Sequence, residues 1–176
     1  MKASLATIVL ILTMNTFLIF DFDKKTDIQN WRIVDDVVMG GRSDGSFTLS
    51  PEGHGLFAGR VSLENNGGFS SVRYGFEKIK VEANSKIVIT LKGDGKPYQL
   101  RVKEDSSTRH SYIAPFVTSG EWQEIAIPLA DMYPVFRGRK LDLPNFAHRQ
   151  IKEIVILIGN KENETFRLLI DKIELK

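Results

Sequence analysis

Apolar and polar residues alternate in short runs along this chain, and clusters of Gly, Asn, Asp and Pro separate the runs. Alternation with a period of two places successive side chains on opposite faces of a β-strand. Closely spaced short runs are typical of a sandwich or barrel. We therefore expect about eleven strands. The runs are TFLIFDF, WRIV, SFTLS, GLFAGRVSL, FSSVRYGF, KIVITLK, YQLRVK, SYIAPFV, WQEIAIPL, IKEIVILIG and FRLLIDKIEL.

The finer pattern predicts where individual strands lie in their sheets. In YQLRVK the apolar side chains are Tyr98, Leu100 and Val102, and the polar ones are Gln99, Arg101 and Lys103. Such a strand has one wet face. The run Ile154 to Ile158 is apolar on both parities, which predicts a central strand that is covered on both sides. The apolar parity shifts between Ile170 and Ile173, which predicts a β-bulge near Asp171.

Helix should be nearly absent, because no window keeps a helical period long enough for a regular helix. The best candidate, PLADMYPVFRGR, is interrupted by Pro134. Asn66-Gly67-Gly68 and Gly93-Asp94-Gly95 predict tight reversals, and we expect the second to be a hairpin turn. The chain has no fixed-period repeat and no linker. We expect one all-β domain over residues 17–176.

Residues 1–16 form an apolar leader, with Lys2 followed by the apolar run Leu5 to Leu12. This layout is typical of an export signal, although no small-x-small cleavage site follows the run. An uncleaved membrane anchor is the second interpretation. The third is that Met14 is the true start, so that NTFLIFDF is simply the first strand. The protein would be exported or anchored in the first two cases and cytoplasmic in the third.

Composition excludes several function classes. The 176 residues are 42% hydrophobic and 26% charged, which is typical of a globular domain. With 24 basic and 22 acidic side chains the net charge is +2, so the chain lacks the basic excess of a nucleic-acid-binding protein. There is no cysteine, and His54, His110 and His148 are too isolated for a typical transition-metal site. We expect no cofactor and no metal.

The segment Val34 to Ser46, VDDVVMGGRSDGS, is the most function-specific stretch. Its Gly41-Arg42-Ser43-Asp44-Gly45 matches the GxSxG nucleophile elbow, but a strand follows where that motif needs a helix. Asp35 and Asp36 are adjacent, so on a strand they would face opposite ways and not pair as glycosidase acids do. We expect one Asp to tie down backbone amides, and Gly40 and Gly41 to turn the backbone with positive φ. The alternative is a calcium site with Asp35, Asp36 or Asp44 and loop carbonyl groups as ligands.

Two further groups of residues are candidates for binding. Aromatic and guanidinium side chains on strands would form a platform that binds sugars or a protein partner. These residues are Tyr98, Tyr112, Trp122, Arg73 and Arg101. The competing interpretation places Trp31 and Trp122 in the core and the two arginines on a sheet surface. The loop MYPVFRGR carries Tyr133, Phe136, Arg137 and Arg139, which suits either protein contact or structural packing.

The order of D-x-VMGG-x-S, F-x-G-x-V-S-x-x-N-x-GGFSSVR, GDGKPYQLRV, WQEIAIPL, FRGR and FRLLIDKIEL resembles the complex I (NADH:ubiquinone oxidoreductase) intermediate-associated protein family. The resemblance runs from Phe20 to the end of the chain. It implies a galactose-binding-like jelly-roll β-sandwich without established catalytic residues. The motif positions are Asp36, Met39, Gly40, Gly41, Ser43, Gly67, Gly68, Phe69, Arg73 and Gly138.

The resemblance also implies a role, because the family includes a mitochondrial assembly factor that acts like a chaperone on respiratory complex I intermediates. We expect a non-catalytic module whose partner is a protein, a respiratory-complex or envelope subunit. The export-like leader favours the alternative, a carbohydrate-binding module of an exported protein. The membrane would be reached only through an uncleaved leader. The candidate binding residues are Asp36, Met39, Arg42, Ser43, Arg73, Tyr98, Arg101, Trp122, Arg137 and Arg139, and the candidate fold-shaping ones are Gly40, Gly41, Gly67, Gly68, Phe69 and Gly138.

Overall fold

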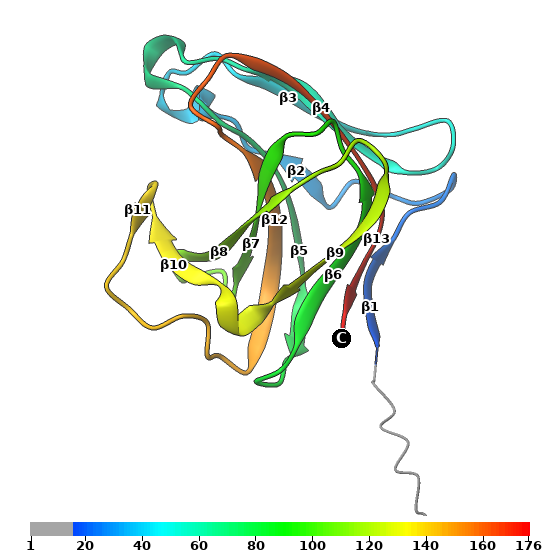
Figure 1. Ribbon diagram of the computed structural model, residues 1–176, viewed down its shortest axis with the longest axis vertical. Coiled ribbons are helices and arrows are strands. Elements are labelled where there is room, and N and C mark those ends of the chain that lie inside the picture. Colours follow the sequence, from blue (N-terminus) through cyan, green and yellow to red (C-terminus); the bar gives the residue numbers. More distant parts are fainter. Residues whose placement is uncertain (1–15) are drawn as a thin grey trace, which may run out of the picture.

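A computed structural model of the chain describes residues 16–176, which form thirteen β-strands in two antiparallel sheets (Figure 1). The leader lies outside the described residues, apart from Thr16. Strand β1 pairs with the C-terminal part of β13, on the edge opposite β6. The six-stranded sheet has the order β3-β4-β13-β6-β9 with β1 on β13, and consists of β1 (Phe17–Asp21), β3 (Asp44–Leu49), β4 (Gly55–Val61), β6 (Lys86–Lys92), β9 (Trp122–Pro128) and β13 (Glu164–Leu175).

The second sheet has seven strands in the order β11-β10-β8-β7-β12-β5-β2. They are β2 (Trp31–Ile33), β5 (Ser70–Lys80), β7 (Pro97–Lys103), β8 (Ser111–Val117), β10 (Tyr133–Phe136), β11 (Arg139–Lys140) and β12 (Gln150–Ile158). The helical content of the described residues is three short 3-10 turns, η1 (Asp36–Met39), η2 (Glu64–Asn66) and η3 (Leu129–Asp131). The all-β prediction is confirmed.

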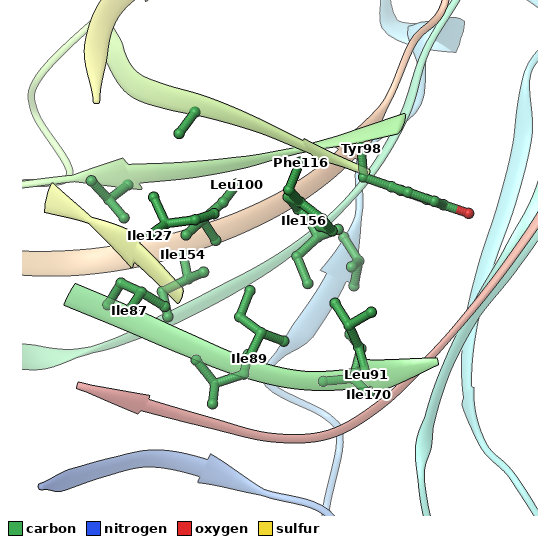
Figure 2. Close-up of a cluster of buried hydrophobic side chains, with 14 of the residues drawn as sticks. Ile87, Ile89, Leu91, Tyr98, Leu100, Phe116, Ile127, Ile154, Ile156 and Ile170 are labelled. Atoms are coloured by element: carbon green, nitrogen blue, oxygen red, sulfur yellow. The ribbon is translucent and has the colours of Figure 1, made fainter. Parts of the chain in front are cut away.

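The core lies between the sheets, where apolar side chains from both inner faces meet (Figure 2). Ile87, Ile89 and Leu91 of β6 lie on one side, and Leu100, Ile154 and Ile156 of the seven-stranded sheet lie on the other. Burial of this apolar surface is the main force that holds two such sheets together. Polar residues that alternate with the core residues are therefore left on the two outer faces of the sandwich.

Three detailed expectations are confirmed. In β7, burial alternates along the strand, with Tyr98, Leu100 and Val102 inside. Strand β12 is central, between β7 and β5, and its apolar residues are buried on both parities. The pairing of β13 with β6 shifts register between Ile170 and Lys172, as the bulge near Asp171 requires.

The structure corrects two expectations about the connections. The segment MYPVFRGR contains the strands β10 and β11, which raise the count from eleven to thirteen. Proline lacks the N–H that a helix needs, but it is tolerated in a short strand near a sheet edge. The turn Gly93-Asp94-Gly95 is not a hairpin, because β6 and β7 belong to different sheets. It carries the chain across the sandwich, and Gly95 adopts a φ of +84° there.

Candidate functional site

Asp36 is the hub of the segment VDDVVMGGRSDGS, and its side chain is fully buried at the start of η1. Oδ1 accepts the N–H of Ser43 at 3.0 Å, and Oδ2 accepts the Ser43 hydroxyl at 2.5 Å. Oδ2 also accepts the N–H groups of Gly68 at 2.6 Å and Phe69 at 3.1 Å. Burial by itself would raise the pKa of this carboxyl group, but these hydrogen bonds outweigh burial and lower the pKa. The expectation that an aspartate ties down backbone amides is confirmed, and no face of Asp36 is left for a ligand.

The neighbouring polar groups are also used within the chain. The Ser43 hydroxyl accepts the N–H of Ser62 at 3.0 Å and is 2% exposed, so it is not available as a nucleophile. Asp35 accepts the N–H of Gly45 at 2.9 Å. Within residues 16–176 no three His, Asp or Glu side chains gather closely enough to hold a metal ion. The segment therefore joins η1 to the connection between β4 and β5 rather than presenting a site.

The glycines of this segment serve two different purposes. Gly40 adopts a φ of +91°, as expected. Gly41 does not have a positive φ, which corrects the expectation. It is required because a Cβ atom there would lie 2.2 Å from Oδ1 of Asp36. Across the hub, a Cβ at Gly67 would lie 2.7 Å from Oδ2, and Gly68 adopts a φ of +137°.

Two other candidates of the segment lie at the surface or cannot be placed. Arg42 is exposed, and its Nη1 lies 3.3 Å from Oε2 of Glu64, which is also exposed. Ion pairs of this kind contribute little to stability. Met39 ends η1, but its side chain is outside what the structure describes.

The expected platform does not form, because its members point in different directions. Tyr98 is 1% exposed and belongs to the core, and its hydroxyl donates to Oδ1 of Asp94 at 3.1 Å. Figure 2 shows Tyr98 at the edge of the core cluster, with its hydroxyl pointing away from the other labelled side chains. Tyr112 is also buried. Trp122 is 43% exposed but starts β9 in the six-stranded sheet, where its ring lies 4.6 Å from His54. Trp31 is a core residue, as expected.

Arg73 and Arg101 do come together, on the outer face of the seven-stranded sheet. Both are in register with Val155 of the central strand, one from each side. Strands are spaced by roughly 4.8 Å, so the two arginine backbones are about 10 Å apart. Burial, followed by repulsion from Arg73, lowers the pKa of the Arg101 guanidinium to about 10. The Arg101 side chain therefore remains a cation at neutral pH.

A shallow cleft of about 400 Å³ lies beside Arg101 on the same face. It is bounded by the strand-borne side chains of β7, β8 and β10 and by the end of the hairpin, and its lining residues are Gln99, Arg101, Ile113, Tyr133, Val135, Gly138 and Lys140. Oε1 of Gln99 accepts hydrogen bonds from Nε and Nη2 of Arg101 at 3.2 and 2.7 Å. The amide therefore holds the guanidinium in place.

The hairpin of β10 and β11 forms one wall of this cleft. Figure 1 shows the hairpin at the edge of the seven-stranded sheet. Its two loop residues, Arg137 and Gly138, have φ values of +47° and +76°, which is the signature of a type I′ turn. The Arg137 guanidinium lies 5.4 Å from the ring centroid of Phe136, which is 36% exposed. Arg139 is exposed on β11, the edge strand of the sheet.

Sequence reasoning missed Gln99 and Lys140 as members of the site. Gln99 had a signal, because alternation in YQLRVK places it on the same face as Arg101. Lys140 had none, since its position depends on how the Arg137-Gly138 turn folds β11 back beside β10. The ammonium group of Lys140 lies 5.0 Å from the ring centroid of Tyr133.

A larger hollow of about 800 Å³ lies at one end of the sandwich and is lined in part by Leu129, Phe146 and His148. Nε2 of His148 lies 2.8 Å from the Tyr112 hydroxyl, and its Nδ1 contacts Glu104. These polar groups are thus paired with one another. The hollow is also lined by Lys80, Glu82, Arg149 and Gln150.

Comparisons with known proteins identify relatives of the whole domain. The family model described as Complex I intermediate-associated protein 30 (CIA30) matches residues 20–170. The mitochondrial Complex I intermediate-associated protein 30 of Mus musculus is 24% identical over 177 residues, which cover 87% of this chain and 54% of the mouse protein. The chain thus spans about half the length of this curated relative.

Among solved structures, the family 11 carbohydrate-binding module of a cellulosomal cellulase from Clostridium thermocellum is similar with a TM-score of 0.67. Its sequence is 14% identical, and the match covers 93% of this chain and 95% of the module. The same type of module in complex with a β-1,3-1,4-mixed-linked tetrasaccharide matches with a TM-score of 0.63 at 14% identity, over 88% of this chain and 94% of the module. An exo-β-agarase matches with a TM-score of 0.58 at 12% identity, over 90% of this chain and 24% of the enzyme. At these identities the likeness concerns the fold, and it confirms the jelly-roll prediction.

Proposed function

The chain belongs to the complex I intermediate-associated protein 30 family, and on that premise we propose that it is a non-catalytic protein-binding module with an assembly-factor role. Residues 17–176 would form its single domain. The observation that carries the proposal is the exposed hairpin of β10 and β11, with Phe136, Arg137 and Arg139 at its tip. Arginine and aromatic side chains are enriched at the centres of protein interfaces. We propose a respiratory-complex or envelope subunit as the partner.

The hairpin suits protein contact for mechanical reasons as well. A two-residue type I′ turn is rigid, so little conformational entropy is lost when a partner binds it. The edge strand β11 consists of only two residues, Arg139 and Lys140, and a short charged edge of this kind disfavours unspecific strand pairing. Leu143, just beyond β11, is 50% exposed and extends the apolar surface near the hairpin.

Capture from a native membrane fraction tests the proposal. The purified domain is immobilised, bound subunits are identified by mass spectrometry, and Phe136→Ala with Arg137→Ala is run beside the wild type. We expect respiratory or envelope subunits to be retained by the wild type and lost by the double variant. Val117→Ala is a matched control, because Val117 is 64% exposed away from the hairpin. Equal retention by all three proteins, or no subunit at all, would contradict the proposal.

A carbohydrate-binding module is the second candidate function, and the cleft beside Arg101 supports it. Proteins bind sugars with tyrosine rings, amides and guanidinium groups, and this cleft has all three. The similar solved structures include carbohydrate-binding modules. One feature weighs against it, because Lys140 lies over the ring of Tyr133 and covers a face on which a sugar would stack. Calorimetry with neutral β-glucan oligosaccharides and Tyr133→Ala tests this candidate. Tyr98→Ala would not serve, because Tyr98 is a core residue.

A further inference from the structure

We propose that the cleft beside Arg101 is an anion-binding site that takes a carboxylate side chain from an acidic segment of a partner protein. This inference rests on the proposed function, since it supplies the chemistry of the partner at the same hairpin. Its occupant is an Asp- or Glu-rich segment that lies across the outer face of the seven-stranded sheet, under the wall formed by β10 and β11.

The cations of this face have few carboxylate partners among residues 16–176. Arg101 hydrogen-bonds to the neutral oxygen of Gln99, and among residues 16–176 no carboxylate lies within 4.0 Å of Arg101 or Lys140. Arg73 has a loose contact, with Nη1 3.9 Å from Oε1 of Glu153. The buried Nε of Arg73 has no hydrogen-bond partner among residues 16–176. The face thus carries more positive charge than the chain itself neutralises.

The positive charges of this face are arranged unfavourably when no anion is bound. Like charges on a half-buried surface repel one another, and an unpaired guanidinium removed from water is unfavourable. A bound carboxylate would relieve both, because it accepts charge-assisted hydrogen bonds from a planar guanidinium. Gln99 already orients the Arg101 fork, so the donor geometry is set before the anion arrives. The apolar side chains of Ile113 and Val135 exclude water beside it.

The aromatic face of Tyr133 distinguishes a protein segment from an acidic sugar as the ligand. A uronic acid would offer the same carboxylate, but its ring needs an open aromatic face, and Lys140 occupies one face of Tyr133. The surface also continues past the cleft to Phe136 and Arg137 at the hairpin tip. An extended peptide would reach both the cleft and the tip, with acidic groups facing the cations and apolar groups facing Phe136. These features favour the peptide.

Fluorescence anisotropy with a labelled peptide of alternating Glu and Val residues tests the inference. We expect saturable binding that weakens with added salt, and that weakens by roughly tenfold or more in Arg101→Gln. Lys140→Gln should weaken it several-fold, and because Lys140 is exposed this variant also covers the case in which Arg101→Gln does not fold. Arg60→Gln is the matched control, since Arg60 is an exposed arginine of β4 in the other sheet, and its affinity should stay within about twofold.

Three results would overturn the inference. They are equal binding of a peptide in which Gln replaces Glu, an equal effect of Arg60→Gln, and tighter Arg101-dependent binding of an oligogalacturonate. Failure here is separable from failure of the proposed function. If the native membrane fraction still yields a subunit that needs Phe136 and Arg137, while the acidic peptide does not bind, the module binds protein but the cleft is not its carboxylate site.

Discussion

The two polar clusters of this domain make opposite use of their charges. In the Asp36 hub, one buried carboxylate receives four hydrogen bonds from the chain's own groups, from Ser43, Gly68 and Phe69. On the outer face of the seven-stranded sheet, Arg101 is held by one neutral amide oxygen. The hydrogen-bonding capacity of the Asp36 hub is used within the chain, whereas the positive charge of the outer face is not fully paired there.

This difference teaches how a family-identifying motif and the proposed binding surface can lie in different parts of the domain. A buried charge is stable only if all its hydrogen-bonding capacity is used, so a hub such as Asp36 restricts every residue around it. Gly41 and Gly67 are examples, because a side chain at either position would collide with the carboxylate. The residues of the motif are therefore required by the packing and hydrogen bonding around the buried carboxylate. A surface cation is under no such constraint, so a binding face leaves a weaker trace in the sequence.

The largest effect should follow removal of the hub. Asp36→Ala leaves a buried hydroxyl and buried amides without an acceptor, and each such loss costs about 1–3 kcal/mol. We expect the free energy of unfolding to fall by about 3–5 kcal/mol, measured by urea denaturation. Asp44→Ala is the control, because Asp44 is exposed in the same segment. A loss below about 1 kcal/mol in Asp36→Ala would show that the hub is not a stabilising centre.

The next effect concerns close packing around the hub. In Gly41→Ala the new methyl group overlaps Oδ1 of Asp36, and overpacking of this kind costs about 1–3 kcal/mol. Gly75→Ala is matched to it, because a Cβ atom at Gly75 meets nothing within 4 Å. Thermal unfolding of the two variants should therefore diverge. Equal melting temperatures would remove steric closeness as the reason for glycine at position 41.

Low pH should reduce the contribution of Asp36 to the free energy of unfolding. The folded-state pKa of Asp36 is lowered, so its contribution to stability is present above its unfolded pKa of about 3.9 and is lost as pH falls through the folded value. The difference in unfolding free energy between wild type and Asp36→Asn should be largest near neutral pH and shrink below about pH 4. A difference that stays constant down to the lowest measurable pH would contradict the assigned protonation state.

The smallest effect on stability should come from Arg101→Gln, on the outer face of the seven-stranded sheet. Arg101 has no carboxylate partner among the described residues, so Arg101→Gln breaks no ion pair there and relieves repulsion from Arg73. We expect its free energy of unfolding to stay within about 1 kcal/mol of wild type. Urea denaturation checks this beside Asp36→Ala. A loss as large as that of the hub variant would mean that Arg101 is structural, and the contrast between the two clusters would disappear.

Much of the fold could be predicted from the sequence, because alternation reports burial directly. The two faces of β7, the central position of β12 and the bulge at Asp171 all follow from the order of apolar and polar residues. Strands β10 and β11 could not be predicted in this way. They are short, one contains Pro134, and their turn places Arg137 at a positive φ that its residue type rarely adopts.

The site was harder to predict, since it depends on contacts between distant parts of the chain. Either Asp35 or Asp36 was expected to hold amides, but the partners Gly68 and Phe69 of Asp36 lie beyond two intervening strands. For Tyr98 the alternation was informative, because it shares the apolar parity of Leu100, and the platform hypothesis overrode that signal. The meeting of Arg73 and Arg101 depends on the order β7-β12-β5, which the sequence pattern does not specify.

The central claim is that binding takes place on the outer face of the seven-stranded sheet and not at the segment VDDVVMGGRSDGS. The direct test is the affinity of the Glu-Val peptide for two variants that each remove one arginine, Arg101→Gln on the face and Arg42→Gln in the segment. Arg42 is exposed, so Arg42→Gln should remain folded, and Arg101→Gln breaks no ion pair among the described residues. We predict a loss of roughly tenfold or more for Arg101→Gln and a change within about twofold for Arg42→Gln. The reverse order of effects would contradict the claim and return the binding site to the segment.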